Sequence, residues 1–292
     1  MTEAAQIRRN APEARAIEIV PVNPTIGAEI RGVDLSQPVD APTYQAIHAA
    51  LMAHKVIFFR DQDITPEQQV AFGRLFGELT IHPFVEHLEH LPEVLVLDND
   101  EDHPVFATDI WHSDETFRVA PPMGSILRCV RIPPAGGDTL WADMCAAYEG
   151  LSDKLRSFLS GLEAMHDFKP FRRKFDSLPV REKHARLAEM EEELPNPIHP
   201  VVRTHPATGQ KALFVNRQFT VAIKGMHEDE SRALLEFLFA QTLVPEYQVR
   251  FRWQPHSIAF WDNAPTQHYA ANDYYPVRRT MHRVTIKGGR PF

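Results

Sequence analysis

The residues best suited to chemistry are a histidine and an aspartate two positions apart, His112 and Asp114, within residues 111–117. Side chains at positions i and i+2 of a strand point to the same face, so an extended His-x-Asp presents an imidazole and a carboxylate to one point. Two histidines and one carboxylate hold non-haem Fe(II) and leave coordination positions open for oxygen chemistry. Residues 261–270 can supply the second histidine, His268. These three residues are therefore predicted to bind a metal ion.

A His-x-Asp pair alone is weak evidence, because the chain has 15 histidines and such a pair is more often structural than catalytic. The context of both segments favours the metal site. Ile110 and Phe117 flank the pair and suit a strand. Pro265 excludes a helix interior just before His268. Arginines follow the second histidine and can take part in the same chemistry.

Several segments together resemble the TauD/TfdA family of Fe(II)- and 2-oxoglutarate-dependent dioxygenases. They are WHSDETF (111–117), GGDTLWADM (136–144), HPVVRTHPATGQKALFVN (199–216) and WDNAPTQHYA with RRTMHRVTIKG (261–270 and 278–288). The resemblance runs from about residue 17 to residue 288. It implies an α+β fold with a double-stranded β-helix, or jelly-roll, core and helical insertions. It also implies that His112, Asp114 and His268 hold Fe(II).

The arginines fit a second part of this chemistry. 2-Oxoglutarate can chelate iron through its C1 carboxylate and keto oxygen, which leaves the C5 carboxylate for the protein, and two-point recognition of a carboxylate favours arginine. In a strand over residues 280–286, alternation places Arg279 and Arg283 on one face and Arg278 on the other. The resemblance assigns 2-oxoglutarate to Arg279 and Thr139. The alternative is a solvated basic strand, with Thr139 only a turn residue after a Gly-Gly bend.

For the primary substrate, the resemblance implies a small organic anion. It assigns the anionic head group to Arg283 and His82 and a pocket wall to Phe219. His82 and Phe219 also have a plainer interpretation, as a structural histidine and a core aromatic residue.

The chain departs from the taurine pattern at several positions. Val85 stands where a tyrosine is typical, Thr108 where an asparagine is typical, and Glu115 where a small apolar residue is common; residues 166–171 also differ. The loss of a phenol and an amide removes hydrogen bonds that would recognise a small amino-sulfonate. The preferred substrate is therefore expected to differ from taurine.

The implied reaction is hydroxylation of a small organic acid, a taurine-like sulfonate first, with release of sulfite, while 2-oxoglutarate and O2 give succinate and CO2. A sulfate ester, an aryloxy acid, a phosphonate or an amino-acid derivative is an alternative substrate. Retention of Asp114 favours hydroxylation, because a small residue replaces the carboxylate in related halogenases. A jelly-roll zinc hydrolase with the same ligands and a non-catalytic acid-binding domain are further alternatives. The hydrolase would leave Arg279 and Thr139 without a role. The acid-binding domain would not need the complete set of His112, Asp114 and His268.

Composition limits the other possibilities. The net charge of −8 argues against a nucleic-acid partner, because phosphate binding requires clustered Lys and Arg. Two cysteines predict neither a disulfide framework nor a cysteine metal site. There is no secretory signal and no membrane span, so the protein is expected to be cytoplasmic. Members of the family imply a homodimer or homotetramer.

The chain has no repeats and no Gly/Ser linker, which predicts one domain over residues 1–292, with residues 1–14 disordered. Strands are expected near 17–22, 28–34, 56–59, 249–253, 257–261 and 280–287. Helices are expected over 42–53, after Thr65 and over 231–242. Residues 145–242 are expected to form a helix-rich insertion. The charged run 181–193 within it is typical of a solvated helix.

Overall fold

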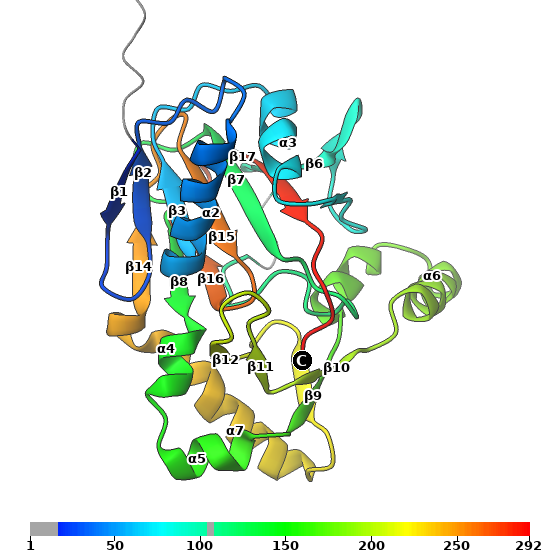
Figure 1. The fold of residues 1–292 in the computed structure, drawn as a ribbon. Helices are drawn as coiled ribbons and strands as arrows, with labels where there is room; N and C mark the ends of the chain where they lie inside the picture. Colours follow the sequence, from blue (N-terminus) through cyan, green and yellow to red (C-terminus); the bar gives the residue numbers. More distant parts are fainter. Residues whose placement is uncertain (1–16, 104–107) are drawn as a thin grey trace, which may run out of the picture.

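The computed structural model describes residues 17–103 and 108–292, so the prediction for residues 1–14 lies outside the described residues. The largest sheet has the strand order β1-β2-β3-β15-β7-β17-β6-β5, with β4 paired to β17 (Figure 1). Its strands are β1 (Glu18–Pro21), β2 (Ala28–Arg31), β3 (Val56–Phe59), β4 (Leu79–Thr80), β5 (His87–Leu88), β6 (Leu91–Asn99), β7 (Gly124–Arg131), β15 (Ile258–Asp262) and β17 (Arg279–Ile286).

A second sheet, of order β14-β8-β16, lies against one face of the first. It consists of β8 (Thr139–Asp143), β14 (Gln248–Phe251) and β16 (Thr266–Ala270). Phe58, Trp261 and Met281 of the large sheet pack with Trp141 and Val249 of the small one in a single buried cluster. Two sheets that share a core in this way form the predicted jelly roll, and the α+β fold class is confirmed.

Two helices cover the other face of the large sheet, α2 (Ala41–His54) and α3 (Pro66–Arg74) (Figure 1). Alternation along the strands separates the two cores: Phe260 of β15 packs under the helices, whereas its neighbour Trp261 faces the small sheet. The predicted start of α3 is confirmed, because Thr65 and Gln68 form a capping box. β17 follows the same alternation, which directs Arg279, Met281 and Arg283 to the inside of the sandwich.

The insertion between β8 and β14 contains the predicted helices and also short strands that the sequence pattern did not indicate. The helices are α4 (Met144–Glu149), α5 (Asp153–Leu159), α6 (Val180–Glu193) and α7 (Glu228–Phe239), with 3-10 turns η1 (Lys169–Phe175), η2 (Ala240–Leu243) and η3 (Pro245–Tyr247). The strands are β9 (Glu163–His166), β10 (Ile198–Pro200), β11 (Val202–Thr204), β12 (Lys211–Leu213) and β13 (Thr220–Ile223). They pair as β10-β9-β13 and β11-β12.

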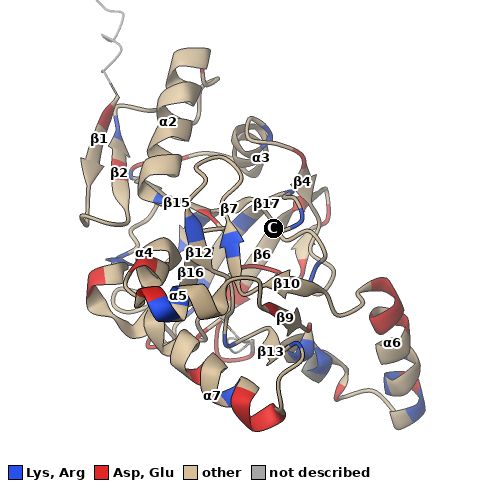
Figure 2. Ribbon diagram, turned by 60° about the horizontal axis from the view of Figure 1, so that its bottom comes forward, with Lys and Arg blue, Asp and Glu red and all other residues tan. Residues whose placement is uncertain are grey.

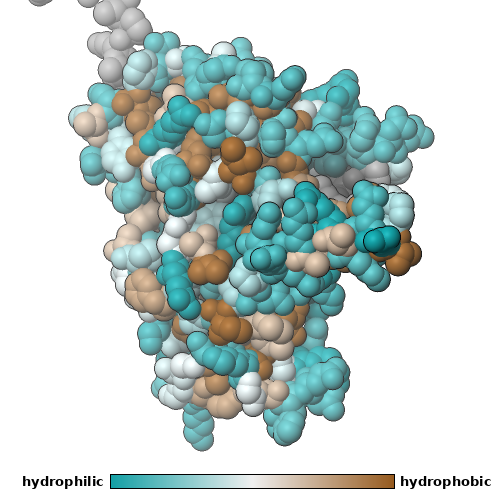
Figure 3. Space-filling model, turned by 90° about the vertical axis from the view of Figure 1, so that its right-hand side faces the viewer, coloured by the Kyte–Doolittle hydropathy of each residue, from teal (hydrophilic) through white to brown (hydrophobic). Residues whose placement is uncertain are grey.

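The charged run forms α6, of which Met190 is the buried residue. α6 carries both basic and acidic side chains, and acidic side chains also mark the start of α7 (Figure 2); hydrophilic residues cover most of the face on which α6 lies (Figure 3). α6 is therefore a solvated helix, as predicted, whereas α7 is amphipathic and buries Leu235 and Leu238. Among the described residues, no helix combines the length and the apolar character that crossing a membrane requires.

Candidate active site

A backbone bridge brings the two predicted histidine ligands together. The N–H of His112 donates to the carbonyl oxygen of His268 at 3.0 Å, and the N–H of His268 donates to the carbonyl oxygen of His112 at 2.7 Å. Side chains opposite each other in such a pair project to the same side. The two rings accordingly lie with their centroids 4.1 Å apart. His268 itself belongs to β16, a strand that sequence analysis did not assign.

Asp114 reaches the same point through a turn. The prediction that His112 and Asp114 share one extended strand is wrong, because the bridge ends at His112 and residues 114–117 form a turn. Glu115 in this turn has φ of 49°, which is uncommon outside glycine. The Asn263 side chain holds the turn: it accepts from the Asp114 N–H at 2.7 Å and donates to the Asp114 carbonyl at 2.9 Å. Asp114 is thus positioned by a contact with a distant segment of the chain, and not by strand alternation as expected.

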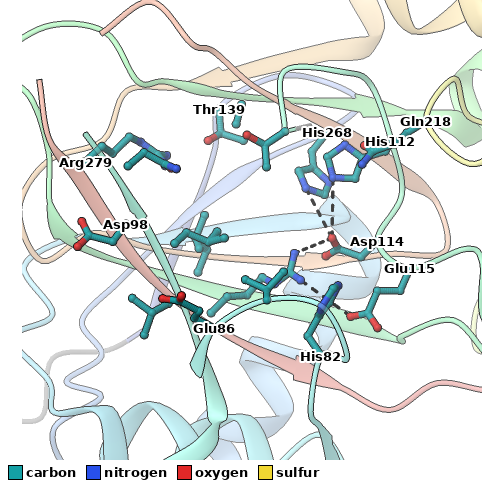
Figure 4. Close-up of a pocket in the computed structure, with 18 of the residues that line it drawn as sticks. His82, Glu86, Asp98, His112, Asp114, Glu115, Thr139, Gln218, His268 and Arg279 are labelled. Atoms are coloured by element: carbon teal, nitrogen blue, oxygen red, sulfur yellow. Dashed lines mark hydrogen bonds and ion pairs between the residues drawn. The ribbon is translucent and has the colours of Figure 1, made fainter. Parts of the chain in front are cut away.

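The three predicted ligands converge in a buried cluster (Figure 4). Asp114 Oδ1 lies 3.9 Å from Nε2 of His112 and 3.9 Å from Nε2 of His268. All three ligand atoms lie within 4.8 Å of one another, which is close enough for one metal ion to contact them together. Two imidazoles and one carboxylate, all on one side, leave further coordination positions open.

The imidazoles have the protonation state that metal binding requires. His112 Nδ1 lies 2.6 Å from the carbonyl oxygen of Ile110, which can only accept, so Nδ1 carries the hydrogen and Nε2 keeps its lone pair. Burial lowers the pKa of His112 and lowers that of His268 still further, so both rings are neutral near pH 7.

Asp114 is held as a carboxylate by its neighbours. Burial, the largest single effect, would raise its pKa, but the Arg283 guanidinium, with Nη1 2.7 Å from Asp114 Oδ1, acts together with His268, His112 and Ser125 to outweigh burial, and the pKa lies well below its usual value. Ser125 Oγ donates to the other oxygen, Oδ2, at 2.7 Å. Sequence reasoning missed Ser125 and Asn263. A serine on the inward face of β7 gives no sequence signal, whereas Asn263 at least lies inside the second motif.

Arg278 and Arg279 lie on opposite faces of the sheet, as alternation predicted. Arg278 is exposed and its Nε lies 3.0 Å from Asp98 Oδ1. Arg279 is only 4% exposed. Its Nε donates to the Gly137 carbonyl at 3.2 Å, but its Nη2 has no partner among the described residues. A buried donor without an acceptor is costly, so this guanidinium fits a site for an anionic ligand. The solvated-strand alternative describes Arg278 and not Arg279.

Thr139, the first residue of β8, lies on the same side of the cluster as Arg279 (Figure 4). The indole Nε1 of Trp253 donates to Thr139 Oγ1 at 2.9 Å. Because an indole N–H can only donate, this bond occupies an acceptor position of the hydroxyl and leaves its hydrogen available for another acceptor. Trp253 was not singled out from the sequence, since nothing in its local context indicates this contact.

A cavity of about 270 Å³ joins these groups. Its lining includes the His112–Asp114–His268 cluster, Arg279 and Thr139. The structure also brings every residue predicted for the substrate to this cavity: His82, Val85, Thr108, Phe219 and Arg283. Arg279 and Arg283 are four residues apart on one strand, so their Cα atoms are separated by about 13 Å. The cavity is therefore lined by two buried guanidinium groups, and that of Arg283 contacts Asp114 at 2.7 Å.

The wall of the cavity next to His112 is apolar. Phe219 is buried, packs against Phe117 with ring centroids 5.2 Å apart, and lies edge-on to His112. Its two interpretations, pocket wall and core residue, are both correct. Val85 packs against the same cluster. A valine in place of a tyrosine leaves this part of the cavity without a phenol hydroxyl.

A jelly roll that buries a His-Asp-His cluster in one cavity with a guanidinium whose Nη2 has no partner among the described residues has the arrangement of a non-haem metal oxygenase with an oxo-acid cosubstrate. The family model described as "Taurine catabolism dioxygenase TauD, TfdA family" matches residues 18–285, and the chain belongs to this family. The protein is a 2-oxoglutarate-dependent dioxygenase, which excludes the hydrolase and non-catalytic alternatives.

Several named proteins of known sequence or structure are similar to this chain. An α-ketoglutarate-dependent sulfate ester dioxygenase of Pseudomonas putida is 40% identical over 96% of this chain and 93% of its own length. An alkylsulfatase of Acinetobacter baylyi is 37% identical over 90% of this chain and 82% of its own. The crystal structure of a taurine dioxygenase from Burkholderia xenovorans has a TM-score of 0.80 at 39% identity and covers 94% of this chain and 90% of that one.

Proposed function

We propose that this enzyme uses Fe(II), 2-oxoglutarate and O2 to hydroxylate the carbon atom that carries the sulfate group of a small alkyl sulfate ester. Sulfate esters take precedence over the sulfonates expected from the sequence, because relatives at 40% and 37% identity are named for sulfate esters. A sulfonate is the second candidate, supported by the likeness to a taurine dioxygenase structure. The single observation that carries the proposal is one cavity lined by the His-Asp-His cluster and by two buried arginines, Arg279 and Arg283.

His112, Asp114 and His268 would hold the iron. The fit rests on the neutral Nε2 atoms and the ionised Asp114 carboxylate, which are the forms that bind a divalent cation. When bound, the ion supplies oxygen activation coupled to decarboxylation of 2-oxoglutarate to succinate and CO2. The buried setting of the three side chains excludes water from the reacting centre.

Arg279 and Thr139 would hold the C5 carboxylate of 2-oxoglutarate. The unpartnered Nη2 of Arg279 and the hydroxyl hydrogen of Thr139 are two donors on the same side of the cluster. A carboxylate that accepts both would satisfy the buried guanidinium. This orients the cosubstrate with its other end toward the metal ligands.

Trp253→Phe is expected to weaken 2-oxoglutarate binding by roughly fivefold, because one hydrogen bond that orients Thr139 is lost, worth about 1 kcal/mol. Calorimetric titration of 2-oxoglutarate into metal-loaded protein measures this. Trp141→Phe is the matched control, since Trp141 lies in the same core but its Nε1 has no partner among the described residues. Equal weakening in both variants would assign the effect to packing and not to Thr139.

Arg283 and His82 would receive the sulfate group, and the apolar wall with Phe219 and Val85 would receive the alkyl chain. A site of this kind has little to recognise the amino group of taurine, because Val85 and Thr108 replace larger polar side chains. The alkyl carbon next to the head group would then lie beside the metal ligands, where the hydrogen is removed.

The product distinguishes the two candidates. Hydroxylation of R–CH2–O–SO3⁻ gives a hemiacetal that releases sulfate and an aldehyde, whereas hydroxylation of R–CH2–SO3⁻ releases sulfite and the same aldehyde. We expect hexyl sulfate to give sulfate, hexanal and succinate in equal amounts, with oxygen uptake that requires 2-oxoglutarate. Sulfite from hexanesulfonate at a higher kcat/KM would support the second candidate. No oxygen uptake with either compound would contradict both.

A further inference from the structure

Glu115 is a buried carboxylate in the substrate cavity whose presence the activity alone does not explain. It is 2% exposed and lines the cavity. Its Oε2 lies 2.5 Å from Arg118 Nε. Its Oε1 lies 3.9 Å from Arg283 Nη2 and makes no hydrogen bond to the described residues.

The Arg283 guanidinium is therefore flanked by two carboxylates. Nη1 contacts Asp114 at 2.7 Å, Nη2 faces Glu115, and Nε has no partner among the described residues. Arg118 pairs with the other oxygen of Glu115, its side chain is 26% exposed, and its Nη2 donates to the carbonyl of Ile81. His82 lies near Glu115 at this end of the cavity (Figure 4).

This arrangement limits the charge that the head-group site can accept. An anion that binds Arg283 also approaches the Glu115 carboxylate within a water-poor cavity, where like charges repel more strongly than in water. An anion with one negative charge is attracted by the Arg283 guanidinium and repelled by the Glu115 carboxylate. For an anion with two charges both energies double, so the Glu115 carboxylate disfavours its binding by twice as much as that of a singly charged anion.

We propose that Glu115 makes the site selective for singly charged head groups, so that sulfate esters and sulfonates are accepted and doubly charged phosphate monoesters of the same shape are rejected. The inference rests on the proposed function, because it takes Arg283 as the head-group residue. Glu115 acts here as a specificity-determining residue. Its carboxylate contributes by charge, since sulfate and phosphate tetrahedra differ little in size.

The test compares hexyl sulfate with hexyl phosphate on the Fe(II)- and 2-oxoglutarate-loaded enzyme under anaerobic conditions. At pH 8 hexyl phosphate is almost entirely a dianion, because its second pKa is about 6. We expect the wild type to bind hexyl sulfate at least tenfold more tightly than hexyl phosphate. In Glu115→Gln, which keeps the shape and removes the charge, that ratio should fall by about tenfold. Glu86→Gln is the matched control, since Glu86 is an exposed carboxylate lining the same cavity.

A wild-type series from pH 8 to pH 5.5 tests the same point without a mutation. The ratio should fall as hexyl phosphate becomes a monoanion. Equal binding of the two ligands at pH 8, or an unchanged ratio in Glu115→Gln, overturns the inference and leaves the proposed function intact. Failure of the wild type to bind hexyl sulfate and hexanesulfonate contradicts the proposed function and overturns the inference with it.

Discussion

Asp114→Ala is expected to abolish metal binding at micromolar iron and to reduce turnover by more than about 100-fold. Loss of a residue that only supports a metal ligand costs up to about 100-fold, and loss of a ligand itself should cost more. Asp114 supplies the only carboxylate oxygen of the buried cluster, and Oδ1 faces both Nε2 atoms at 3.9 Å. Without it, two neutral imidazoles would hold a dication beside the Arg283 guanidinium. Iron affinity, measured by anaerobic titration, and oxygen uptake without substrate should fall together.

The same substitution should also destabilise the metal-free protein. Removing one partner of a buried ion pair leaves an uncompensated charge, which costs about 3–5 kcal/mol in general, and Glu115 at 3.9 Å from Arg283 Nη2 should reduce that cost here. Asp98→Ala is the control, because Asp98 also lines the cavity but pairs with the exposed Arg278. Iron binding by Asp114→Ala that equals wild type would remove Asp114 from the set of ligands.

Local sequence pattern was sufficient for those parts of the site that depend on strand alternation. The inward direction of Arg279 and Arg283, and the outward direction of Arg278, follow from the two-residue period of β17. The helix start at Thr65 follows from its capping residues. In both cases the determining interactions lie within a few positions of each other, so the sequence displays them.

The pattern failed where the geometry depends on contacts between distant segments. Asp114 is placed by a turn that Asn263 holds, and the expected strand does not extend to it. The contact of Trp253 with Thr139 joins positions 114 residues apart. Strands β9–β13 are three to four residues long, too short for alternation to distinguish them from loops. Such features follow from the packing of the whole chain and have no local signature.

Arg279→Ala is expected to raise the 2-oxoglutarate concentration for half-maximal rate by about 100-fold or more, while the corresponding value for the primary substrate changes by no more than about threefold. The size follows from two charge-assisted hydrogen bonds, each worth about 1.5–3 kcal/mol. Arg279→Lys should recover only part of the loss, because an ammonium group lacks the two-point geometry of the guanidinium. Steady-state kinetics with each substrate varied in turn measures the two effects separately.

A shorter cosubstrate isolates the contact that Arg279 makes. 2-Oxobutyrate keeps the oxo-acid end of 2-oxoglutarate but lacks the C5 carboxylate, so the wild-type enzyme should use it poorly and Arg279→Ala should use it about as well as the wild type does. Arg278→Ala, on the outer face of the same strand and paired with Asp98, should behave as wild type with both oxo acids. If the activity of Arg279→Ala fell by the same factor with 2-oxoglutarate and with 2-oxobutyrate, Arg279 would maintain the shape of the cavity and would not bind the C5 carboxylate.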